Sequence, residues 1–102
     1  DMQENIQRRV LPTCATNVSL EAEVKVNQKN KTDREAYIRF VFFDIKTKAT
    51  VAEVVVSRLT AIDLQRITAE LLKKVNTTMK QKTLPKQPII KAESDEKPQY
   101  VG

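Results

Sequence analysis

Apolar and polar residues alternate without a break over 17–27, which directs this part of the chain toward extended structure. Successive side chains of a β-strand point to opposite faces, so a period of two predicts a strand with one buried and one solvated face. The apolar face carries Val18, Leu20, Ala22, Val24 and Val26. The polar face carries Ser19, Glu21, Glu23 and Lys25.

Two more strands are predicted, over 36–43 and 50–57, because both segments are rich in aromatic and β-branched residues. A polar loop over 28–35 and a turn over 44–49 separate the three strands. Consecutive strands with short links pair as neighbours, so we expect an antiparallel meander.

An amphipathic helix is expected over 60–78. Thr60 is the predicted N-cap, with Asp63 at the third helical position, and Lys73 and Lys74 lie toward the negative end of the helix dipole. The apolar stripe consists of Leu64, Ile67, Leu71, Leu72, Val75 and Met79. The predicted class is therefore α+β: a three-stranded antiparallel β-meander followed by one amphipathic helix packed on one sheet face.

The predicted domain covers 1–82, followed by a polar, proline-containing tail over 83–102. Met2, Ile6 and Val10 recur every four residues, which favours a short N-terminal helix ending before Pro12.

Strands 36–43 and 50–57 carry apolar residues on both faces, whereas one helix covers only one face of a sheet. A large open apolar patch is uncommon on a soluble monomer, so the second face is predicted to be a self-association surface. Its members are Tyr37, Val41, Phe43, Val51 and Val55. The alternative is that 1–12 or 84–90 folds back over this face.

The composition excludes several classes of site. The chain has no His, one Cys (Cys14) and one Gly (Gly102), which excludes imidazole catalysis, a thiolate zinc cluster and a glycine-rich phosphate loop. An enzyme would need a pocket built from carboxylates and lysines alone, so we expect no enzymatic activity and no cofactor. Neither a membrane span nor a leader peptide is evident, and we expect a cytoplasmic protein.

Three smaller features have ordinary interpretations. Glu21 and Glu23 share a strand face without a third metal ligand, which favours a solvated face over a cation site. Cys14 has no histidine or other base nearby in the sequence, and is expected to be unreactive. The three Asn-x-Ser/Thr triplets, at Asn17, Asn30 and Asn76, are interpreted as coincidental because glycosylation requires export.

The net charge of +5 comes mostly from one segment, 71–91, which holds six lysines and no acidic residue. These are Lys73, Lys74, Lys80, Lys82, Lys86 and Lys91. A lysine run meets phosphates without reading bases, so the alternative function is non-specific nucleic-acid binding. A simpler interpretation is a solvated helix end. The first hypothesis is a non-enzymatic interaction or assembly module that forms a homo-oligomer or binds a protein partner.

Residues 37–75 resemble a family of small prokaryotic domains of unknown function. The matching elements are Phe43-Asp44, the segment Val54-Val55-Val56-Ser57-Arg58, and the helical run from Asp63 to Leu72. The family's proline at the helix start is replaced by Thr60-Ala61 in this chain. The resemblance implies strand, turn, strand and helix, and it implies no activity.

Overall fold

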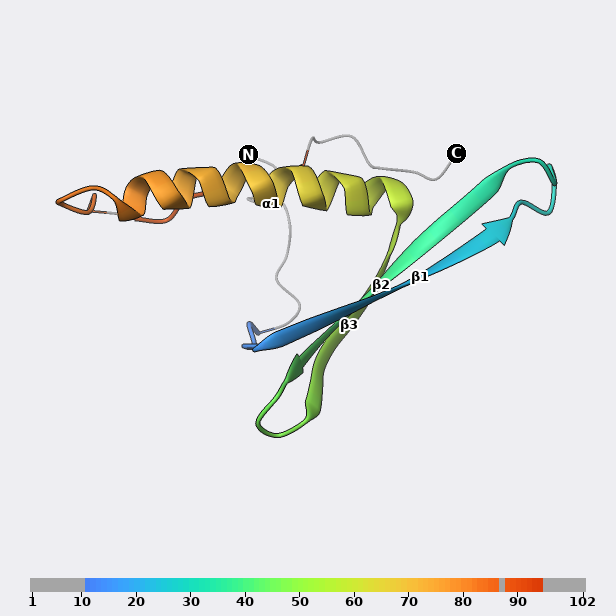
Figure 1. Cartoon of the computed structure of the whole chain (residues 1–102), viewed down its shortest axis with the longest axis horizontal. Coiled ribbons are helices and arrows are strands. Elements are labelled where there is room, and N and C mark those ends of the chain that lie inside the picture. Colours follow the sequence, from blue (N-terminus) through green and yellow to red (C-terminus); the bar gives the residue numbers. More distant parts are fainter. Residues whose placement is uncertain (1–10, 87, 95–102) are drawn as a thin grey trace.

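A three-stranded sheet and one helix make up the fold in the computed structural model, which describes residues 11–86 and 88–94. The elements are β1 (Asn17–Val26), β2 (Arg34–Asp44), β3 (Ala49–Ser57) and α1 (Arg58–Met79). The strands are antiparallel in the order β1-β2-β3, and α1 contacts the sheet (Figure 1). The predicted meander followed by a helix is confirmed. The predicted N-terminal helix lies outside the described residues.

The strand register separates apolar from charged residues. In β1 and β3, Leu20 and Val54 lie opposite Phe40, so even-numbered residues of the three strands share one face. We call this the even face; it is apolar apart from Arg34 and Asp44, which lie at the two ends of β2. Its apolar members are Val18, Leu20, Ala22, Val24, Val26, Ala36, Ile38, Phe40, Phe42, Ala52, Val54 and Val56.

The opposite face, which we call the odd face, is mixed. It carries Ser19, Glu21, Glu23 and Lys25 from β1, Tyr37, Arg39, Val41 and Phe43 from β2, and Glu53 and Val55 from β3. The β2–β3 register shifts between Phe42 and Phe43, and Val51 falls in this bulge without an opposite residue on β2. The turn before β3 closes through Lys48, which adopts a left-handed φ of 58°.

The helix begins earlier than predicted. Ser57, not Thr60, is the N-cap, and its Oγ accepts a hydrogen bond from the Thr60 backbone N–H at 3.2 Å. Both residues carry a hydroxyl, but Ser57 ends β3 in the extended conformation that an N-cap requires. Asp63 therefore lies beyond the first turn, where it pairs with Arg66 at 2.8 Å. The last turn carries no basic residue, so Lys73 and Lys74 lie one turn before the end.

Replacing Ser57 with alanine is expected to lower the free energy of unfolding by about 1 kcal/mol, because the Thr60 N–H loses its acceptor. Urea unfolding followed by circular dichroism measures this change. Ser57→Asp retains an acceptor and is the control, expected to stay close to the native chain. An equal loss in both variants would contradict the capping role.

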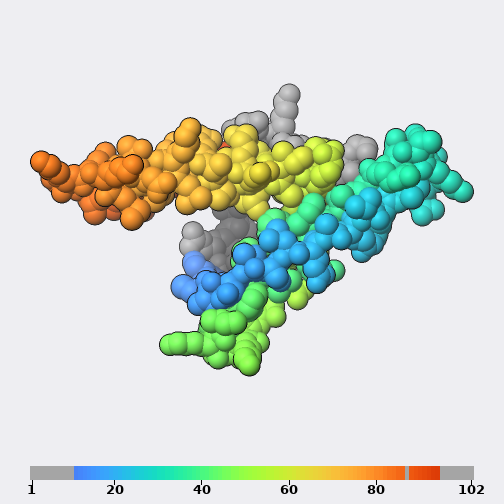
Figure 2. Space-filling view, viewed as in Figure 1, coloured from blue at the N-terminus to red at the C-terminus, as the bar shows by residue number. Residues whose placement is uncertain are grey.

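Coverage of the sheet by α1 is partial. Within the described ranges, the helix contacts β2 and β3 but not β1. The helix has 22 residues, about 33 Å of length, and its C-terminal half extends past the strands (Figure 2). The chain then turns back, and the Lys74 Nζ lies 3.4 Å from the Lys91 carbonyl oxygen.

Candidate interaction surfaces

None of the residues that the structure describes is buried, although the chain has the length of a domain that normally encloses a core. Five of the fourteen exposed large hydrophobic residues in the described ranges lie on the even face. Leu20 is 56% exposed and Val24 is 66% exposed. Val18, Val26 and Val54 are also exposed. The apolar side of the sheet therefore faces solvent over much of its area.

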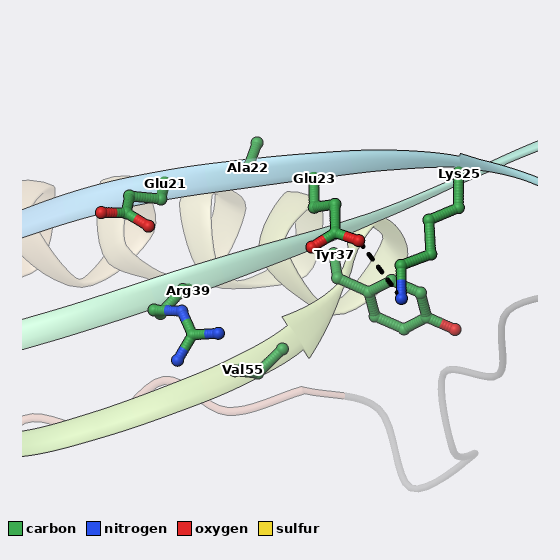
Figure 3. Close-up of a pocket in the computed structure, with 7 residues that line it drawn as sticks. All are labelled: Glu21, Ala22, Glu23, Lys25, Tyr37, Arg39 and Val55. Atoms are coloured by element: carbon green, nitrogen blue, oxygen red, sulfur yellow. Dashed lines mark ion pairs between the residues drawn. The ribbon is translucent and has the colours of Figure 1, made fainter.

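The position of α1 explains why the even face is open. The helix lies behind the sheet in the close-up, away from the odd-face side chains (Figure 3). It therefore lies on the even side, where it reaches β2 and β3 only. Its residues Leu59, Ile67, Leu71 and Val75 are half-buried. The sequence-based expectation that one helix covers this face is wrong for β1.

The five residues predicted as an interface occupy a different environment. Tyr37, Val41 and Phe43 are half-buried on the odd face, and Val51 is half-buried at the bulge. Only Val55 is exposed, at 52%. The structure brings these residues next to charged side chains of β1 and β3. Their role as an interface stays a prediction.

The charged side chains of the odd face pair with one another. Glu53 accepts from Arg39 Nη1 at 3.4 Å, and Glu23 lies 3.2 Å from the Lys25 ammonium. That ammonium also lies 5.9 Å from the centre of the Tyr37 ring, a cation–π distance.

A shallow hollow of about 460 Å³ lies among these pairs. Its lining consists of Glu21, Ala22, Glu23, Lys25, Tyr37, Arg39 and Val55 (Figure 3). Two carboxylates and two cations line it, and it is open to solvent. In the described part of the chain, no three potential ligands gather at a metal-binding spacing. The hollow is therefore a solvated surface in which Glu23 pairs with Lys25.

The segment proposed as an alternative cover is itself exposed. Leu84 is 60% exposed and Ile89 is 78% exposed, whereas Ile90 is half-buried. The other candidate segment, 1–12, lies mostly outside the described residues, and its Leu11 is 84% exposed. The described part of 84–90 thus leaves most of its own apolar surface in solvent.

The six predicted lysines lie along one projecting part of the molecule. All six are exposed, and Lys74 pairs with Glu70 at 3.6 Å.

Two smaller features of the sequence, Asn30 and Cys14, lie outside these surfaces. Asn30 accepts from the Thr32 hydroxyl at 2.7 Å and so shapes the β1–β2 loop. Cys14 is a free, exposed thiol.

The even face of β1 is the surface that sequence reasoning did not select. The alternation over 17–27 predicts an apolar strand face, but it does not indicate whether the helix covers that face. No helix in the described ranges is long and apolar enough to cross a bilayer.

No protein-family model matches this sequence, and the searches of curated proteins and of solved structures found no match.

Proposed function

We propose that this chain is a non-enzymatic assembly module that forms a homodimer through the even face. The observation that carries the proposal is the β1 half of this face, where Leu20 and Val24 are more than half exposed and which α1 does not contact. Burial of apolar area is the dominant favourable term in association. A second sheet packed face to face would lie about 10 Å away and bury these side chains.

The area of exposed surface supports a partner. The chain exposes 9268 Å², whereas a compact monomer of its mass exposes roughly 5900 Å². A standard protein interface removes about 800 Å² from each partner, which is well within this excess. This excess belongs to the whole chain, and the even face contributes to it through exposed side chains such as Leu20 and Val24.

Chemical self-complementarity favours a second copy as the partner. A two-fold axis places a surface against itself, so a charged surface meets like charges while a purely apolar one does not. The even face is apolar apart from Arg34 and Asp44 at the two ends of β2. The odd face instead carries Glu21, Glu23 and Glu53, which favours the even face as the contact surface.

Sedimentation equilibrium of the full chain at several concentrations tests the proposal. The expected mass at tens of micromolar is twice 11.7 kDa, falling toward the single-chain value on dilution. A mass of 11.7 kDa at the highest concentration would overturn it. Larger masses without a dimer plateau would indicate open, heterologous contacts instead of the closed pair.

A further inference from the structure

The end of α1 and the chain that follows it form a basic surface, which we call the lysine arm. Its members are Lys73, Lys74, Lys80, Lys82, Lys86 and Lys91. Lys80 caps the helix with its N–H on the Thr77 carbonyl at 3.2 Å. The chain then reverses, and Lys74 donates to the carbonyl of Lys91. The fold thus brings lysines that are 17 residues apart next to each other.

Few acidic side chains neutralise the positive charge of the lysine arm. No acidic residue occurs over 71–91, and within the described ranges only Lys74 of the six takes part in an ion pair, with Glu70. The arm also projects past the strands, away from the carboxylates of the odd face (Figure 2). Its positive potential is therefore concentrated at one end of the molecule.

We propose that the lysine arm binds the phosphate backbone of duplex nucleic acid, at a site separate from the even face. Lys73 and Lys80 lie two helical turns apart, about 10.5 Å along the axis, on the side opposite Leu71 and Val75. Neighbouring phosphates of a duplex offer dense charge over such a length. Binding is sequence-independent because the arm has no arginine to read base edges.

The choice of a duplex over the other polyanions follows from the side chains around the lysines. Single-stranded nucleic acid is held by stacking on aromatic rings, and 71–91 contains none. Leu71 and Val75 of the apolar helix face are half-buried, whereas Leu72 and Met79 are exposed. An anionic membrane is therefore the competing ligand that the test has to exclude. A duplex requires only cations at its surface.

Titration of a labelled, random-sequence DNA duplex at several salt concentrations tests this site. The native chain should bind with an affinity that falls steeply with salt. The variant K73Q/K80Q/K82Q should bind about tenfold or more weakly, and the slope of log K against log salt should fall by about one for each phosphate contact removed.

The matched control is K29Q/K31Q/K46Q, which removes the same charge from exposed lysines of the β1–β2 loop and β2–β3 turn. It should stay within about twofold of the native affinity if the arm is the site. An equal loss in the control, or binding that ignores salt, would overturn the proposal. So would retention on phosphatidylserine vesicles without retention on the duplex. All variants should sediment as the native chain does, which separates this result from the dimer.

Discussion

A chain with Val24→Glu is expected to sediment as a monomer at concentrations where the native chain is a dimer. Val24 is 66% exposed on the even face, opposite Ala36, so the single chain tolerates a carboxylate there. Face-to-face packing would bury one such carboxylate from each chain among apolar side chains, with Arg34 at the end of the face as its one cationic neighbour on the described strands. The dissociation constant should rise at least about 100-fold, measured by sedimentation equilibrium. An unchanged circular dichroism spectrum would show that the chain stays folded.

Two neighbouring residues of β3 provide the matched control. Val54 and Val55 are similarly exposed, at 47% and 52%, but Val54 lies on the even face and Val55 on the odd face. Val54→Glu should dissociate the dimer. Val55→Glu should not, because its carboxylate lies opposite Arg39. The reverse result would assign the interface to the odd face, as the sequence pattern first predicted.

The secondary structure was largely predictable because each element has a strong local period. The alternation over 17–27 predicted β1, Asn17–Val26, almost to its ends. The helix start was misplaced, because Ser57 and Thr60 are equivalent caps by sequence and only the extended backbone of Ser57 distinguishes them. Asp63 consequently lost its predicted capping role.

The candidate surface was harder to predict from the sequence. Which strands the helix covers depends on the direction of the helix axis, and hydrophobic periodicity does not specify that direction. Ser57 ends β3 and caps α1 at once, so the helix starts directly at the β3 edge without a loop. From there it reaches β2 and leaves β1 uncovered. An apolar stripe at helical spacing predicts that the helix packs against other apolar residues. It does not predict the angle at which the helix axis crosses the sheet. The β1 part of the face on which the helix packs is therefore not contacted by α1.

Truncation of Phe40 to alanine is expected to produce the largest loss of stability of any single substitution considered for the sheet. Phe40 is central on β2, aligned with Leu20 and Val54, and its ring stacks on that of Phe42 with centroids 6.3 Å apart. It is half-buried in one chain and would be fully covered in the proposed dimer. The free energy of unfolding should fall by about 2–4 kcal/mol in urea titrations.

The concentration dependence of unfolding distinguishes packing within one chain from packing between two. If the dimer stabilises the fold, the native midpoint rises with protein concentration, and Phe40→Ala weakens that rise. Phe43→Ala is the control, because Phe43 is also half-buried but lies on the odd face. It should cost stability while leaving the concentration dependence intact. A native midpoint that does not vary with concentration, with equal losses in both variants, would mean that the even face contributes to stability only within a single chain.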